Sequence, residues 1–225
     1  MKCASTALLL LCLNVLPCIA APLTSPPIKK ENLSSSIKGD IAAGKTKVDD
    51  NGCQECHGAD GNGQGLNNGA TGKFAKLAGQ YPDYITKQIR EFRTGERKHD
   101  LMAIMAKSID DTDAADIAAY FASQKKMQGD RSSDNPVGKN LFANGDTSRN
   151  ILSCVSCHGI DGKGIDQPQQ TIPVIGGQEW KYLEKQLQDW RSSERHNSAD
   201  GVMNIFAKQL TDAEILALTN YISGL

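Results

Sequence analysis

Cys53-Gln-Glu-Cys56-His57 and Cys154-Val-Ser-Cys157-His158 are two copies of one five-residue pattern, and they decide the fold. In Cys-x-x-Cys-His, the two thiols add across the two vinyl groups of one haem, and the adjacent histidine ligates the iron. Two copies therefore predict two covalently attached haem c groups. The predicted thioether residues are Cys53, Cys56, Cys154 and Cys157, and the predicted histidine ligands are His57 and His158.

Cys-x-x-Cys pairs also occur in redox-active disulfides and in zinc sites. The two pairs here lie about 100 residues apart, whereas common zinc modules place theirs about 15–20 residues apart. The strand–helix alternation of a thioredoxin-like site surrounds neither pair. The haem interpretation is therefore preferred.

The first twenty residues have the layout of a secretory signal. Lys2 gives a positive start, residues 7–16 are almost wholly apolar, and small residues follow near Ala20. We expect a cleaved signal peptide over 1–20, a flexible tail over 21–37 and a periplasmic protein with at most peripheral membrane association. A retained anchor and a lipid-modified Cys18 are the alternatives. Cleavage would leave only the four motif cysteines.

The composition argues against some partners and suggests a cofactor-filled core. With 25 basic and 26 acidic residues and no dense basic run, nothing indicates a nucleic-acid partner. Aromatic residues make up 5% of the chain. With so few aromatic residues, domains of about 90 residues would have small hydrophobic cores, and a large apolar cofactor would complete the core of each domain. We expect a monomer.

The chain repeats beyond the motif. A shift of 101 residues places Met102 on Met203, and a shift of 98 residues places Tyr84 on Tyr182. A duplicated domain explains both shifts. We expect domain 1 over 38–127, a polar linker over 128–135 and domain 2 over 136–225.

Each domain is expected to be all-α, because no period-two run long enough for a strand is present. Helices are predicted before each motif (37–46 and 137–143), as an amphipathic pair (82–93 and 179–191), and at the end of each domain. A Thr211–Glu214 capping box begins the last one. Glycine-rich loops are expected over 58–72 and 159–164.

A thioether sixth ligand would close each iron site and raise its potential. Met203 is the only methionine of domain 2, and the repeat selects Met102 in domain 1. Met105 aligns with Phe206, a packing position, and is interpreted as a core residue. The rival sixth ligands are Met105, His99 and His196, the histidines being interpreted as solvated loop residues.

Four arginines recur near these methionines: Arg93, Arg97, Arg191 and Arg195. They fit a solvated helix end, or pairing with haem propionates or with the other domain. Phe92 and Trp190, at matching positions, are interpreted as core aromatics rather than electron guides.

At these residues the chain resembles the di-haem cytochrome c4 family, which has two class I cytochrome c domains in tandem. The similar stretches are Cys56-His-Gly-Ala-Asp-Gly61, Leu77-Ala-Gly-Gln80, Tyr84-Ile-Thr-Lys-Gln88, Ala118-Ala-Tyr120, Cys157-His-Gly159, Ile175-Gly-Gly-Gln178 and Tyr221-Ile-Ser-Gly-Leu225.

The resemblance implies two domains, each wrapped around one haem, with ligation by His57 and Met102 and by His158 and Met203. It also implies that the carbonyl of Pro173 orients His158. Ala75 takes the place of that proline in domain 1, so we expect a looser first site.

The family's role, passing electrons from a quinol-oxidising complex toward a terminal haem–copper oxidase, is implied in the same way. Two closed sites favour an electron-transfer protein over an enzyme. The alternative is the haem subunit of a flavocytochrome-type dehydrogenase that oxidises sulfur compounds.

Overall fold

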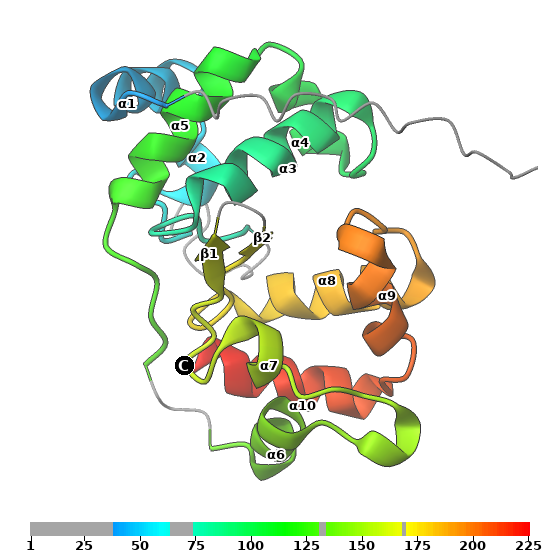
Figure 1. Ribbon diagram of the computed structural model, residues 1–225. Helices are drawn as coiled ribbons and strands as arrows, with labels where there is room; N and C mark the ends of the chain where they lie inside the picture. Colours follow the sequence, from blue (N-terminus) through cyan, green and yellow to red (C-terminus); the bar gives the residue numbers. More distant parts are fainter. Residues whose placement is uncertain (1–37, 64–73, 131–133, 168–169) are drawn as a thin grey trace, which may run out of the picture. The chain divides into compact units, whose positions relative to one another are not determined.

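Two sets of helices follow each other along the chain, one for each copy of the haem motif (Figure 1). The computed structural model describes residues 38–63, 74–130, 134–167 and 170–225. The predicted signal peptide and tail, and most of the first glycine-rich loop, lie outside the described residues. All the described residues belong to one compact unit of the chain.

The helices of the two sets correspond in order, which confirms the all-α class. Domain 1 contains α1 (Ile41–Asp50), α2 (Gln54–His57), α3 (Pro82–Thr94), α4 (Asp100–Ala106) and α5 (Asp111–Ser123). Domain 2 contains α6 (Pro136–Asn144), α7 (Val155–His158), α8 (Trp180–Ser192), α9 (Val202–Ala207) and α10 (Asp212–Ser223), with 3-10 turns at Thr147–Arg149 and Ala199–Gly201.

A small antiparallel hairpin in domain 2 contradicts the prediction that there are no strands. It pairs β1 (Ile165–Gln167) with β2 (Gln170–Ile172), with Ile165 opposite Ile172. Strands of three residues are too short to show a period of two. Gly164 permits the close pairing, since a Cβ there would lie 2.0 Å from the carbonyl oxygen of Ile172.

Side-chain caps mark the starts of α1 and α10. The first helix was predicted over 37–46, but α1 starts at Ile41 because the Asp40 carboxylate accepts the N–H of Ala43 at 2.8 Å. The predicted capping box of Thr211 and Glu214 is confirmed at the start of α10.

Each domain has its own hydrophobic core, and in each a first and a last helix cross closely. Helix α1 packs on α5, and α6 packs on α10. Gly44 and Gly138 sit at the crossings, where a Cβ would lie 2.0 Å from Asp116 O and 2.1 Å from Ala217 O respectively. Phe121 and Phe142 are fully buried in the two cores.

The chain is packed where the predicted domain 1 meets the predicted linker. The Met127 side chain is 1% exposed, and its N–H donates to Ala78 O at 3.1 Å. Two residues later, Gly129 N–H donates to Leu225 O at 2.6 Å. Within the described parts of the chain, we find no helix with the length and apolar character needed to cross a membrane.

Candidate functional site

The haem-motif cysteines and histidines lie on one-turn helices or directly before them. Cys53 precedes α2, which ends at His57, and Cys154 precedes α7, which ends at His158. Residues four apart share one face of a helical turn, so the first thiol and the imidazole of each motif lie on the same side. All four cysteines are free thiols, available for the predicted thioether bonds.

The environment of these thiols differs from that of a redox-active pair. Burial raises the pKa of Cys53 and Cys56, and it raises the pKa of Cys154 to about 11. Redox-active Cys-x-x-Cys sites have at least one thiol of lowered pKa. The motif is therefore better suited to a structural attachment than to disulfide exchange.

A backbone carbonyl fixes the tautomer of each histidine. His57 Nδ1 lies 2.8 Å from Ala75 O, and His158 Nδ1 lies 3.1 Å from Pro173 O. A carbonyl oxygen only accepts, so Nδ1 carries the proton and the Nε2 lone pair is free for a metal. The alanine carbonyl thus makes the same bond as the proline carbonyl, and the looser first site stays a prediction.

Both imidazoles are held in the form that binds metals. Burial lowers the pKa of His57 and His158, and the bonds to Ala75 and Pro173 offset this only in part. A histidine ligand must be neutral, so the structure keeps each ring in its ligating state near neutral pH.

Glycines bring the orienting carbonyls into place. The carbonyl oxygen of Gly61 accepts the N–H groups of Leu77 and Ala78 at 2.7 and 3.0 Å. A Cβ at Gly61 would lie 2.8 Å from the nitrogen of Ala78. The same pair of bonds holds Ile175 and Gly176 to Gly162 in domain 2. The segments carrying Ala75 and Pro173 are thus tied to the chain just after each motif.

The methionines differ in burial. Met102 on α4 is half-buried against the core of domain 1, and Met203 on α9 is half-buried in domain 2. Met105 is 37% exposed, so its interpretation as a core residue is wrong. The roles of Met102 and Met203 as sixth ligands stay predictions.

His99 does more than occupy a loop. Its Nδ1 accepts the N–H of Met102 at 3.3 Å and so caps α4, while its ring meets the edge of Phe92. His196 is exposed. Sequence reasoning missed the cap because histidine is an uncommon N-cap residue.

These donors fit haem c. Each domain offers two thiols, a neutral imidazole with its Nδ1 already bonded, and a methionine on a separate short helix. That combination matches covalent attachment with a histidine and a thioether as axial ligands.

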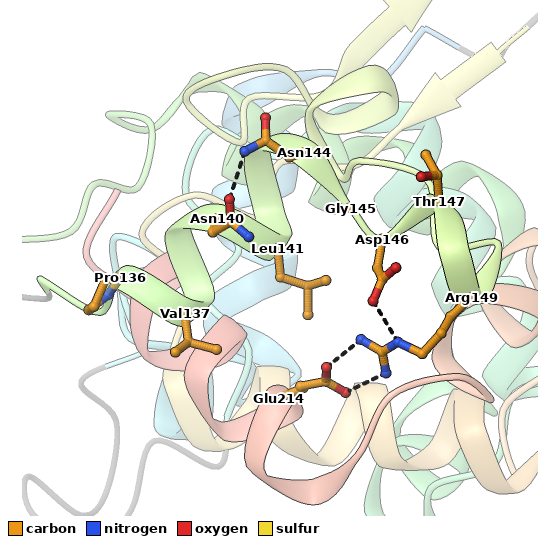
Figure 2. Close-up of a pocket in the computed structure, with 10 residues that line it drawn as sticks. All are labelled: Pro136, Val137, Asn140, Leu141, Asn144, Gly145, Asp146, Thr147, Arg149 and Glu214. Atoms are coloured by element: carbon orange, nitrogen blue, oxygen red, sulfur yellow. Dashed lines mark hydrogen bonds and ion pairs between the residues drawn. The ribbon is translucent and has the colours of Figure 1, made fainter.

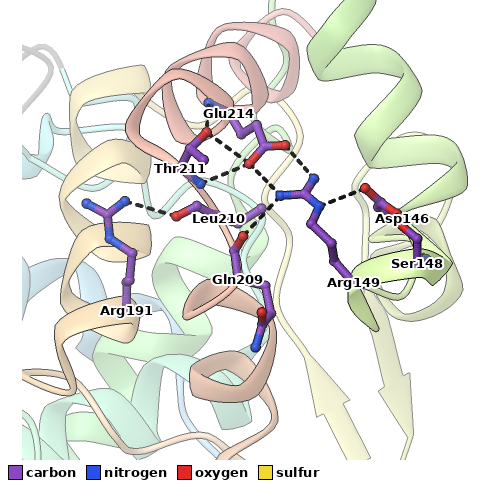
Figure 3. Close-up of polar contacts among 8 residues, drawn as sticks. All are labelled: Asp146, Ser148, Arg149, Arg191, Gln209, Leu210, Thr211 and Glu214. Carbon is purple, nitrogen blue, oxygen red and sulfur yellow. Dashed lines mark hydrogen bonds and ion pairs between the residues drawn. The ribbon is translucent and has the colours of Figure 1, made fainter.

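The four recurrent arginines have two different roles. Arg191 donates to Leu210 O (Figure 3) and also to Asp212. Arg93 donates to Ile109 O and Asp111, so both arginines bond within their own domains. Arg97 and Arg195 are each 7% exposed. Their guanidiniums reach across to the other domain, onto Tyr182, Gln186, Tyr84 and Gln88.

The two aromatic residues beside these arginines are buried. Phe92 and Trp190 are 7% and 5% exposed. Arg97 lies 4.5 Å from the ring centroid of Phe92, and Arg195 lies 4.3 Å from that of Trp190. Their interpretation as core aromatics agrees with this burial, and the rings also support the buried guanidiniums.

A separate pocket on domain 2 (Figure 2) is lined by α6, the turn that follows it and Glu214. Its one arginine, Arg149, donates to Asp146 at 2.7 Å and to both carboxylate oxygens of Glu214 at 2.5 and 3.1 Å. None of the predicted haem residues lines it. The arginine ties the turn to the start of α10.

Comparison with known proteins identifies the family. The family model for cytochrome c matches residues 41–125 and 137–225. Cytochrome c4 from Pseudomonas aeruginosa is 40% identical over 190 residues, which are 83% of this chain and 89% of that protein. The chain belongs to the cytochrome c4 family.

The chain is also similar to a solved cytochrome c4 and to a relative named for thiosulfate oxidation. The crystal structure of reduced recombinant cytochrome c4 from Pseudomonas stutzeri matches with a TM-score of 0.74 and 35% identity, covering 83% of this chain and 99% of that one. A Stutzerimonas stutzeri protein named thiosulfate dehydrogenase electron acceptor is 33% identical, over 76% of this chain and 78% of its own. The chain is therefore a di-haem electron-transfer cytochrome with two tandem cytochrome c domains.

Proposed function

We propose that this cytochrome c4 family member works in the periplasm, carrying electrons from a quinol-oxidising complex toward a terminal haem–copper oxidase. One observation carries the proposal. Each domain holds a neutral histidine by its Nδ1 and sets a methionine on a separate helix. A site closed by histidine and methionine exchanges electrons and leaves no position for a substrate.

The residues take the following roles. The cysteines of each motif anchor one haem, and the neutral imidazoles of His57 and His158 bind the irons. Met102 and Met203 supply the thioether ligands, which favour the ferrous state. The haem supplies the one-electron change at its iron, and the protein sets the potential at which that change occurs.

Haem load is the first test. Acid–acetone extraction should leave both haems on the polypeptide, and the intact mass should exceed the apoprotein mass by two haem masses. A mass corresponding to one haem, or to bound zinc, contradicts the proposal.

The partners are tested by following the haem spectra during turnover. A purified quinol-oxidising complex should reduce both haems, and membranes containing a haem–copper oxidase should reoxidise them. The proposed direction of electron transfer is wrong if the oxidase does not accept electrons from the reduced protein.

A second candidate rests on the relative named as a thiosulfate dehydrogenase electron acceptor. In this case the chain would be the haem partner of a dehydrogenase that oxidises sulfur compounds. Thiosulfate and its dehydrogenase should then reduce the haems faster than the quinol-oxidising complex does. Stable co-elution of the two proteins would identify a subunit rather than a separate carrier.

We propose that the mature protein is a monomer in the periplasm, with at most peripheral membrane association. The predicted signal peptide over 1–20 supports export. Sedimentation of the mature protein should give the mass of one chain, and cell fractionation should place it in the periplasmic extract. Recovery only with detergent would favour the retained anchor.

A further inference from the structure

Two buried glutamines link the domains by paired hydrogen bonds to the opposite backbone. Gln178 of domain 2 accepts the N–H of Lys76 at 2.7 Å and donates to its carbonyl at 2.9 Å. Gln80 of domain 1 makes both bonds to Val174, each at 2.9 Å. Both side chains are 4% exposed, and they occupy matching positions in the sequence repeat.

The orientation of each side-chain amide follows from its partners. The oxygen of Gln178 also accepts the N–H of Glu179 at 2.9 Å, and that of Gln80 accepts the N–H of Tyr81 at 3.1 Å. A backbone N–H can only donate, so the oxygen of each glutamine must face these groups. Each glutamine therefore presents an acceptor to the N–H of the opposite domain.

The contacted N–H groups belong to the peptide groups that hold the haem histidines. Lys76 N–H and Ala75 C=O are the two ends of one peptide, and that carbonyl bonds His57. Val174 N–H and Pro173 C=O form the equivalent peptide, whose carbonyl bonds His158. One planar, delocalised group thus joins a glutamine of one domain to a histidine of the other.

Hydrogen bonds in such a chain strengthen one another. An acceptor on the N–H draws electron density toward the carbonyl oxygen and makes it a better acceptor, by about 10–30% per bond. The carbonyl then draws the Nδ1 proton more strongly and raises the basicity of Nε2, the nitrogen left for the iron.

We propose that Gln178 tunes the first haem through His57 and that Gln80 tunes the second through His158, each acting from the opposite domain. They are positioning residues, since neither contacts the histidine itself. A more basic histidine stabilises ferric iron, so each glutamine lowers the potential of the haem in the other domain. The inference rests on the proposed attachment of both haems.

Gln178→Met and Gln80→Met test the proposal in the intact protein, because methionine fills the space without an acceptor oxygen. The potential of each haem is measured by spectroelectrochemistry, with the haems assigned by NMR contacts to their domains. The Nδ1 proton resonances of His57 and His158 report the hydrogen bonds directly. Gln178→Met should raise the potential of the first haem and move the His57 resonance upfield, and Gln80→Met should do the same at His158.

Two controls separate this effect from a loosened interface. Gln178→Glu keeps an acceptor oxygen for Lys76 N–H, so the His57 resonance should stay in place or move downfield. Tyr81→Phe removes another cross-domain bond, to Lys163 O at 2.7 Å, without touching either histidine-bearing peptide, and should leave both resonances unmoved. A shift confined to the mutated domain, an equal shift at both haems, or no shift would overturn the proposal. The haem count of each variant, read from its mass, tests the proposed attachment separately.

Discussion

Arg97 of domain 1 donates a hydrogen bond to the hydroxyl of Tyr182 in domain 2 at 3.0 Å, and the repeat makes the same bond in reverse, from Arg195 to Tyr84, at 3.0 Å. Gln186 and Gln88 accept from the same two guanidiniums. Two copies of one domain can meet on a self-complementary surface, where each contact occurs twice. The duplication seen in the sequence thus explains why this contact between the domains occurs twice.

Replacing Arg97 by Leu should lower the free energy of unfolding by about 1–3 kcal/mol, because the half-buried Tyr182 and Gln186 lose a charged donor. Urea unfolding followed by circular dichroism measures the change. Arg90→Leu is the matched control, since Arg90 lies on α3 but is exposed, and it should change stability by less than about 0.5 kcal/mol. Equal losses in the two variants would mean that the cross-domain bonds add nothing to stability.

Acid should weaken domain 2 through Glu214. The hydrogen bonds from Arg149 lower the pKa of Glu214 from its ordinary value of 4.5 to about 2. Because the folded pKa is the lower one, this stabilisation is complete above pH 4.5 and is lost as the pH falls toward 2. Hydrogen bonds from Ser148 and Arg149 likewise lower the pKa of Asp146 to about 2.

Arg149→Gln should therefore shift acid unfolding to higher pH. Thermal melts between pH 7 and pH 3 measure this, and the gap in stability between variant and parent should narrow below pH 4.5, where Glu214 becomes protonated in the unfolded chain. Lys45→Gln, which removes an exposed pair with Asp49, should leave the acid profile unchanged. A gap that stays constant with pH would show that Arg149 acts through packing alone.

Met102→Ala should weaken the absorption band of thioether-ligated ferric haem and lower one reduction potential, because the iron loses the ligand that favours its ferrous state. Met203→Ala should do the same at the other haem. Met105→Ala should leave both potentials unchanged and cost little stability, since the side chain is 37% exposed. Loss of the band in Met105→Ala, with Met102→Ala unaffected, would show that the sequence alignment chose the wrong methionine.

Gly138→Ala should destabilise domain 2 by about 1–3 kcal/mol, because the added methyl would force α6 away from α10. A Cβ at that position would lie 2.1 Å from the carbonyl oxygen of Ala217. Lys139→Ala, at the exposed neighbouring position, should be nearly neutral. Chemical unfolding measures the free energy of unfolding of both variants. Equal values would mean that α6 and α10 can move apart at little cost.

Sequence reasoning predicted the fold class, because the repeated haem motif and the 3.6-residue patterns are local signals. The repeat also selected Met102, but no helix was predicted there, and α4 is found only in the structure. Sequence reasoning missed the β1–β2 hairpin, since three-residue strands show no readable period. It also treated Met105 as buried, because alignment with Phe206 says nothing about which side of α4 faces solvent.

The sequence could not decide between the two roles of the arginines for a similar reason. All four recur in the repeat, yet Arg93 and Arg191 close their own domains while Arg97 and Arg195 cross to the other. Periodicity reports which residues share a face of one helix, and it carries no information about contacts between domains. Periodicity could not predict the contacts from Gln178 and Gln80 to the histidine-bearing peptides for the same reason.

Gln80 and Gln178 also bear on how two copies of a duplicated domain can evolve. Copies that fold independently are free to diverge, because a substitution in one does not affect the other. Here each copy supplies the acceptor for a backbone N–H of the other, so a change at one glutamine alters the surroundings of the opposite histidine. We therefore expect substitutions at these positions to be selected on their effect in the partner copy, which ties the two halves to a shared evolutionary history.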